Sequence, residues 1–78
     1  MINEEQFLKD LKVMLKSDET IEMDTDLLDI DNWDSFSMVT FIALSEEKYG
    51  VKIEPFAIAG AVLVEDLYSV VNEALGGN

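Results

Sequence analysis

The chain has 78 residues, 49% of them hydrophobic, and it contains no cysteine and no histidine. A chain of this size fits a single domain over residues 1–78, and its composition excludes disulfides, thiolate metal sites and Ser/His/Asp or Cys/His nucleophiles. The 17 acidic residues outnumber the 5 basic ones, for a net charge of −12, but the hydrophobic content is too high for a disordered acidic tail.

The first predicted element is an amphipathic helix over residues 3–16. Asn3 is a candidate N-cap, and Gln6 stands where the partner of a capping box belongs. Apolar residues recur every three or four positions, which predicts one buried helical face. These residues are Phe7, Leu8, Leu11, Met14 and Leu15.

Residues 17–34 have no helical period and predict a long, acidic connection. Because such a loop stays ordered in a small domain only if it packs, we expect some of its apolar residues to be buried. The candidates are Ile21, Met23, Leu27, Leu28, Ile30 and Trp33.

The acidic residues of this connection are spaced like the first half of a calcium-binding EF-hand loop. Counted from Glu22, however, the sixth position is Leu27 and the twelfth is Trp33. An EF-hand needs Gly and a bidentate Glu at those two places. We therefore expect no metal site.

A second helix is predicted over residues 35–49, with Asp34 as its N-cap and Gly50 just past its end. A helical wheel divides it into two faces. The expected core face holds Met38, Phe41, Ile42, Ser45 and Tyr49. The expected outward face holds Phe36, Val39, Thr40, Ala43, Glu46 and Glu47, an apolar strip with an acidic rim.

The last third of the chain predicts one short and one longer helix. Pro55 can open a short helix over residues 55–61. Residues 65–75 then place Leu67, Val70, Val71, Ala74 and Leu75 on one face, before Gly76 and Gly77. The expected fold is an all-α four-helix bundle with three longer helices, a short third helix and no strands.

Ser35 stands at the start of the second predicted helix, where backbone N–H groups and the helix dipole favour an attached or bound phosphate. The alternative is ordinary helix capping, and the residue spacing alone leaves both interpretations open.

Residues 34–53, "DSFSMVTFIALSEEKYGVKI", resemble the second helix and following turn of acyl carrier proteins. In that family an Asp-Ser-Leu triplet opens a helix that ends in a Glu pair, an aromatic residue and Gly. Asp34 and Ser35 match the triplet, with Phe36 in the Leu place. The far end is matched without a gap by Glu46, Glu47, Tyr49, Gly50, Val51 and Ile53. The length, acidity and helix order of the whole chain agree.

This resemblance implies that Ser35 carries 4′-phosphopantetheine, which a phosphopantetheinyl transferase takes from coenzyme A. It also implies that Asp34 faces the transferase, and that enzymes with basic patches, which load and process the acyl group, dock on the outward face of the second helix. The docking residues would be Phe36, Val39, Thr40, Ala43, Glu46 and Glu47. The chain would then be a carrier rather than an enzyme, because the reactive thiol belongs to the cofactor.

Several departures from the family pattern imply a specialised carrier of polyketide, modified-lipid, cell-surface polysaccharide or aminoacyl transfer. Thr40 stands where the common fatty-acid carriers have an acid, Phe36 is bulkier than Leu, and residues 55–64 are unusually apolar. Two alternatives stay open: an aminoacyl or peptidyl carrier, and an acidic adaptor that is never modified. The absence of Gly before Ser35 favours an acyl over a peptidyl cargo.

The charge also bears on partners and location. So acidic a surface repels nucleic acid and anionic lipid, whereas it attracts basic patches on proteins. The N-terminal stretch "MINEEQFLKD" does not read as a signal peptide, and no apolar run approaches the roughly 20 residues of a transmembrane helix. We expect a monomeric cytoplasmic protein.

Overall fold

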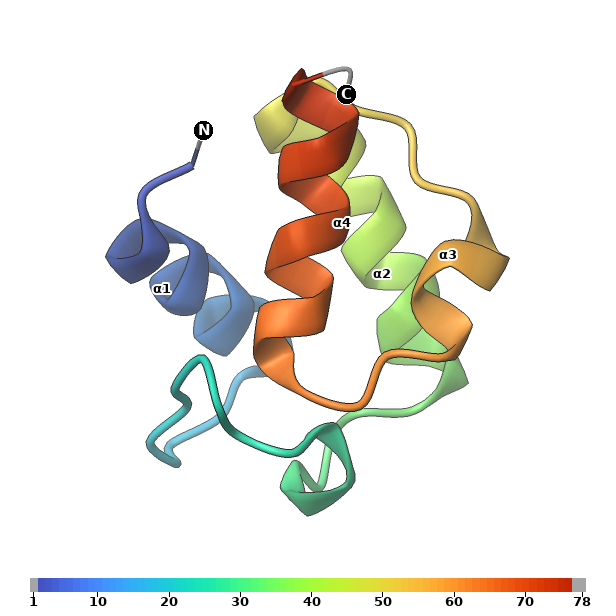
Figure 1. Cartoon of the computed structure of the whole chain (residues 1–78). Helices are drawn as coiled ribbons and strands as arrows, with labels where there is room; N and C mark the ends of the chain where they lie inside the picture. Colours follow the sequence, from blue (N-terminus) through green and yellow to red (C-terminus); the bar gives the residue numbers. More distant parts are fainter. Residues whose placement is uncertain (1, 77–78) are drawn as a thin grey trace.

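A computed structural model describes residues 2–76, and over this range it is helical without a β-strand. Its four α-helices are α1 (Glu4–Leu15), α2 (Ser35–Leu44), α3 (Pro55–Ala59) and α4 (Val64–Gly76). A 3₁₀ turn, η1 (Leu27–Asp29), interrupts the long connection, and a π-helical turn, η2 (Ser45–Tyr49), continues α2. In Figure 1, α4 lies between α1 and α3, and α2 passes behind it. The expected small all-helical bundle with a short third helix is confirmed.

The caps of α1 explain its bounds. The Asn3 side chain accepts a hydrogen bond from the Gln6 backbone N–H at 3.1 Å, which confirms the predicted N-cap. The helix ends at Leu15, and Lys16 follows in the left-handed conformation with φ of 54°. The Ser17 N–H then closes the end of the helix onto the Lys12 carbonyl.

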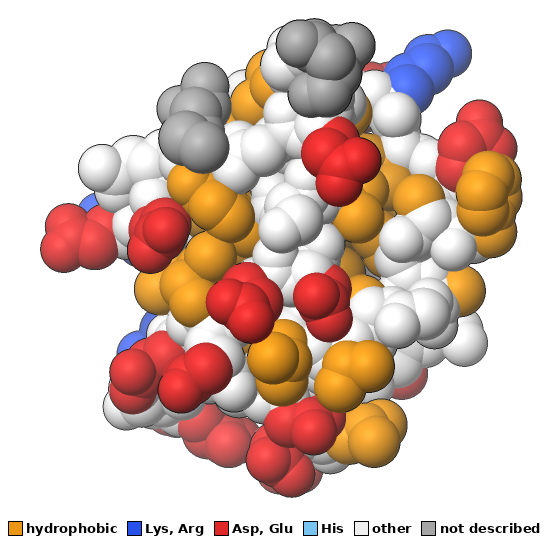
Figure 2. Space-filling view, in the orientation of Figure 1, with side chains coloured by type: hydrophobic (Ala, Val, Ile, Leu, Met, Phe, Trp, Pro, Cys, Tyr) orange, Lys and Arg blue, Asp and Glu red, His pale blue; other side chains and the backbone are white. Residues whose placement is uncertain are grey.

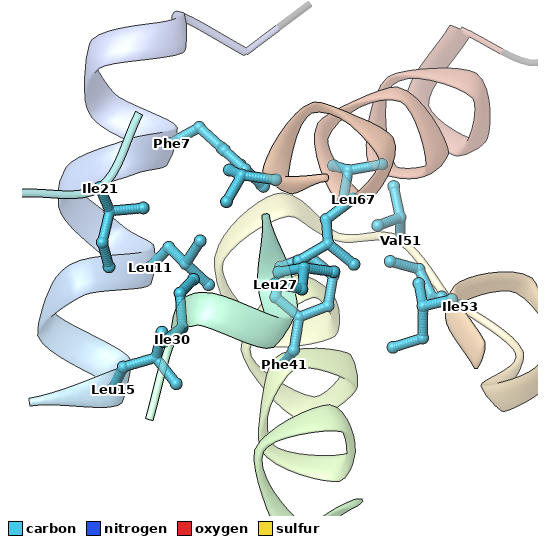
Figure 3. Close-up of a cluster of buried hydrophobic side chains, with 13 residues drawn as sticks. Phe7, Leu11, Leu15, Ile21, Leu27, Ile30, Phe41, Val51, Ile53 and Leu67 are labelled. Atoms are coloured by element: carbon cyan, nitrogen blue, oxygen red, sulfur yellow. The ribbon is translucent and has the colours of Figure 1, made fainter. Parts of the chain in front are cut away.

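The core is built from both ends of the chain. Phe7 packs edge-on against Phe41 and Tyr68, with ring centroids 6.0 and 5.2 Å apart. Figure 3 shows side chains of α1, the long connection, α2 and α4 pointing toward this centre. The buried hydrophobic residues are Phe7, Leu11, Leu15, Ile21, Leu27, Ile30, Phe41, Val51, Ile53, Ile58, Val64, Leu67 and Val71.

The long connection is packed, as expected. Its backbone pairs with the segment before α4, since the Leu27 N–H donates to the Val62 carbonyl at 2.9 Å and Asp26 forms an antiparallel bridge with Leu63. Leu27 is therefore held inward while its neighbour Leu28 is 90% exposed. The connection buries Ile21, Leu27 and Ile30, and partly buries Met23 and Trp33.

The apolar face predicted for the last helix is buried only over the first two turns of α4. Leu67 and Val71 are fully buried and Val70 is partly buried. Ala74 and Leu75 follow on the same face but are exposed. The helical period continues, but the buried stripe ends at Val71 because the last turn of α4 extends past the core. Gly77 lies outside the described residues.

The short third helix is two residues shorter than predicted. Pro55 is its first residue, as expected, but the helix ends at Ala59 rather than at residue 61. Within residues 2–76, none of the helices is long and apolar enough to cross a membrane.

Candidate functional site

Ser35 is the first residue of α2 and is exposed to solvent. Asp34 precedes it in an extended conformation, and the Asp34 carboxylate accepts the Ser37 backbone N–H at 2.9 Å. Asp34 is therefore the N-cap, as predicted. Within the described residues the Ser35 hydroxyl makes no hydrogen bond to the protein, so helix capping does not account for this serine.

Ser37 differs sharply from Ser35 although it lies only two residues away. It is buried, and its hydroxyl contacts both the Asn32 carbonyl oxygen and the Asp34 carboxylate, the latter at 3.1 Å. These contacts fasten the end of the long connection to the first turn of α2. Ser37 could not be distinguished by its sequence position, because a place three residues after an N-cap is also usual for an exposed polar residue.

The capping interactions hold Asp34 ionised. Hydrogen bonds from the Ser37 backbone and hydroxyl, together with the Phe36 backbone N–H, lower the Asp34 pKa below its ordinary value of 3.8. Asp34 is exposed, so this fixed negative charge stands in solvent directly beside Ser35.

The two predicted faces of the second helix are confirmed by burial. On the inward side Phe41 and Ser45 are fully buried, and Met38, Ile42 and Tyr49 are partly buried. On the outward side Phe36 is 79% exposed and Val39 is 65% exposed. Ala43, Glu46 and Glu47 are exposed as well, and Thr40 is half-buried, with its hydroxyl donating to the Phe36 carbonyl at 3.0 Å.

The end of the predicted helix is not α-helical. Residues Ser45–Tyr49 form a π-helical turn, and Gly50 ends it with φ of 71°, the left-handed conformation that glycine adopts without a steric penalty. Inside the bundle the Ser45 hydroxyl donates to the Phe41 carbonyl at 2.9 Å. This small residue lets the backbone of η2 come close to the core.

The π turn faces a buried carboxylate that the sequence analysis missed. Asp10 of α1 is only 7% exposed. It accepts hydrogen bonds from the Tyr49 hydroxyl at 2.7 Å, from Gln6 Nε2 at 2.9 Å and from Lys48 Nζ at 3.0 Å. We call these four residues the Asp10 cluster. The sequence does contain a signal for the Asp10 cluster. Asp10 lies three residues after Phe7, so the helical period places it within the buried stripe of α1.

The Asp10 cluster perturbs two ionisable groups. Burial acts to raise the Asp10 pKa, but the hydrogen bonds from Tyr49, Lys48 and Gln6 outweigh it and bring that pKa below 3.8. Burial and the adjacent Asp10 charge raise the Tyr49 pKa. Asp10 is therefore ionised and Tyr49 neutral at physiological pH, which fixes the direction of the hydrogen bond between them.

We expect the Asp10 cluster to make the protein sensitive to acid. Since the folded-state pKa of Asp10 is lowered, its stabilising contribution is fully present above about pH 3.8 and is lost as the pH falls through the folded-state pKa. Asp10→Asn should cost about 1–3 kcal/mol at pH 7. That cost should shrink below pH 3.8, as measured by denaturant unfolding at pH 7 and pH 3. Asp18→Asn, at an exposed position, is the control, and an equal loss from both variants would contradict the role of the cluster.

Two hollows lie beside the outward face of α2. The first, about 310 Å³, adjoins the start of the helix and is mainly polar, with Lys16, Asp31, Asn32 and Asp34 in its wall. The second, about 530 Å³, is a mainly apolar groove between α1 and α2. Its lining residues include Val13, Met14, Ala43 and Leu44. Met14 and Thr40 line both hollows, so the two adjoin.

A separate exposed apolar patch lies near the N-terminal end of α4. Leu28 of η1 and Val62 of the α3–α4 connection are exposed, and the Leu27–Val62 backbone bond brings their segments together. Figure 2 shows several hydrophobic side chains at this lower end, with acidic side chains beside them and elsewhere on the face.

Among the described residues no group of three or more acidic side chains could hold a metal ion. Comparisons with protein-family models, with curated proteins and with solved structures find no match for this chain.

Proposed function

We propose that this protein is a carrier that holds acyl groups as thioesters on a 4′-phosphopantetheine arm attached to Ser35. The observation that carries the proposal is the state of Ser35: an exposed, unbonded hydroxyl on the first residue of α2, beside a separate residue that performs the capping. The resemblance of residues 34–53 to acyl carrier proteins supplies the chemistry.

The surroundings of Ser35 suit an attached phosphate. The residue lies at a helix N-terminus, where the helix dipole stabilises negative charge. In the attachment step Ser35 Oγ forms a bond to the β-phosphorus of coenzyme A, adenosine 3′,5′-bisphosphate leaves and the serine proton is released. The role of Ser37 is to hold Asp34, and with it the first turn of α2, in one conformation.

The arm supplies the thiol that the chain lacks, so the protein's own task is presentation. Phe36, Val39 and Ala43 form an apolar strip on α2, and Glu46 and Glu47 flank it. A partner enzyme with a basic patch would be steered by the acids and held by the apolar strip. Thr40 and Phe36 favour a dedicated partner set over the common fatty-acid enzymes.

The proposal is tested by intact-mass measurement. The protein is incubated with coenzyme A and a broad-specificity phosphopantetheinyl transferase, and it is expected to gain the mass of one phosphopantetheinyl group. Peptide mapping should place that mass on Ser35 and not on the buried Ser37. If the mass is gained, loading assays with acyl and aminoacyl donors separate the two kinds of carrier from one another. Absence of any mass gain would favour the unmodified acidic adaptor.

Val39→Asp is expected to weaken transfer of the acyl group to cognate enzymes about tenfold or more. The reason is that a charge replaces an apolar contact at the centre of the apolar strip on α2. Stability should change little, because Val39 is 65% exposed. Transferase kinetics and circular dichroism melting measure the two effects.

Glu47→Lys is the comparison for this prediction. An exposed rim charge acts mainly on the rate of encounter, so this variant should slow association and reduce its dependence on salt. If Val39→Asp left transfer unchanged, the outward face of α2 would not be the docking surface.

A further inference from the structure

The hollow between α1 and α2 is continuous with the apolar strip on α2, because Ala43 belongs to both. Its other apolar lining residues are Val13 and Met14 of α1 and Leu44 of α2. Val13 is 69% exposed, so the α1 side of this surface is open to solvent. A partner that docks on the strip would therefore also cover the hollow and part of α1.

The charged residues of this hollow are separated by helix. Asp10 and Lys48 pair with each other at 3.0 Å, so their charges offset one another. The other two charged lining residues are Lys9, on α1, and Glu47, on η2. The hollow therefore has a positive side on α1 and a negative side on the segment that continues α2.

The hollow at the start of α2 repeats this arrangement. Lys16, the C-cap of α1, is its positive lining residue, and Asp31 and Asp34, which precede α2, are its negative ones. Lys9 and Lys16 thus lie about two helical turns apart on the side of α1 toward α2. Both are exposed, and within residues 2–76 neither forms an ion pair, although the chain has 17 acidic residues.

This arrangement disfavours a partner of one sign. Packed helices lie about 8–10 Å apart, which is similar to the distance of about 8 Å over which physiological salt screens charges. A partner seated over the hollow therefore interacts with both signs. A uniformly basic surface would be attracted by the acidic rim of α2 but repelled by Lys9 and Lys16. A uniformly acidic surface would be repelled by that rim and by the net charge of −12.

We propose that α1 and α2 together select a partner enzyme whose docking surface carries both signs. Its basic residues lie against the rim of α2, its acidic residues lie against Lys9 and Lys16, and its apolar residues lie between them over the hollow. This inference rests on the proposed function and deepens it, because it gives the charge pattern of the partner that docks beside Ser35. Lys9 and Lys16 are then specificity-determining residues, which repel enzymes whose carrier-binding surface is basic throughout.

Two synthetic helical peptides test this charge pattern without any enzyme. Both contain the same numbers of lysine, glutamate and leucine residues and have no net charge. In the first peptide the lysines and glutamates lie on opposite sides of a leucine stripe, and in the second they alternate on both sides. The first peptide is expected to bind about fivefold more tightly, with amide chemical shift changes at Val13 and Ala43. Equal affinities, or shift changes centred on α3 and α4, would overturn the inference.

Variants of the lysines show which charges produce this preference. Lys9→Glu is expected to reduce it to about twofold or less, and Lys9→Gln should give an intermediate value, since the effect follows charge. Lys52→Glu makes the same change at an exposed lysine that lines neither hollow, and it should leave the preference intact. Equal losses from Lys9→Glu and Lys52→Glu would overturn the inference. Circular dichroism melting checks that each variant is folded.

A second measurement follows the attachment reaction. For a broad-specificity transferase with a basic carrier-binding surface, Lys16→Glu should lower KM about threefold and leave kcat unchanged, because it removes repulsion beside Asp34. Lys52→Glu should leave KM nearly unchanged. An unchanged KM for Lys16→Glu, or an equal fall for Lys52→Glu, would overturn the inference. If the wild-type protein is never modified, the proposed function fails, and the peptide comparison still decides the charge pattern.

Discussion

Ser35→Ala is expected to abolish attachment of phosphopantetheine completely, since the substitution removes the oxygen to which the arm would be bonded. The fold should be unaffected. Ser35 is exposed and Asp34 already caps α2, so the free energy of unfolding should change by no more than about 0.5 kcal/mol. Intact mass after incubation with coenzyme A and transferase measures the first effect, and chemical unfolding measures the second.

Two other serines make this prediction specific. Ser69→Ala removes an exposed hydroxyl from α4 and should leave both modification and stability unchanged. Ser37→Ala removes a buried hydroxyl that contacts Asn32 and Asp34, and it should lower stability by about 1 kcal/mol while modification persists. A Ser35→Ala protein that still gained the arm would show that another residue is the acceptor.

Phe41→Ala is expected to destabilise the protein by about 3–5 kcal/mol, the usual cost of emptying a buried phenylalanine site. Phe41 is fully buried, and its ring meets Phe7 and Trp33 edge-on at 6.0 and 6.3 Å. These contacts join α1, the long connection and α2. Since small domains are stable by only about 5–15 kcal/mol, this loss is a large share of the total stability. Denaturant unfolding followed by circular dichroism measures the loss.

Phe36→Ala is the matched control, because it removes the same side chain from the same helix at a position that is 79% exposed. It should cost less than about 0.5 kcal/mol in stability. Similar losses from the two variants would mean that the inward and outward faces of α2 have been exchanged. The apolar strip on α2 would then not be the docking surface.

Much of the helical framework is determined locally and is therefore visible in the sequence. Asn3 and Asp34 cap α1 and α2 through their own side chains, Pro55 opens α3, and Gly50 ends η2 with a positive φ. These devices act within a few residues. The two faces of α2 follow from its helical period in the same way, which is why the exposed strip at Phe36 and Val39 could be predicted.

Features that depend on which elements meet could not be predicted in this way. Ala74 and Leu75 continue the apolar period of α4, but their burial required neighbours that the bundle does not place there. Leu28 is as hydrophobic as Leu27 and lies outside only because the backbone of the long connection pairs with the segment at Val62. The spacing of apolar residues along a helix indicates which of them share a face. Tertiary packing decides how much of that face is buried.

The same distinction applies to the candidate site. The sequence alone determined that a serine follows an N-capping aspartate at the start of a helix with an apolar outward strip, because caps and helical faces are local properties. The tertiary structure decided that Ser37 is buried while Ser35 is free, that α1 brings Lys16 and Met14 beside the start of α2, and that Asp10 holds the π turn. Each of these depends on contacts between residues far apart in the chain, which form only when the helices pack around one core.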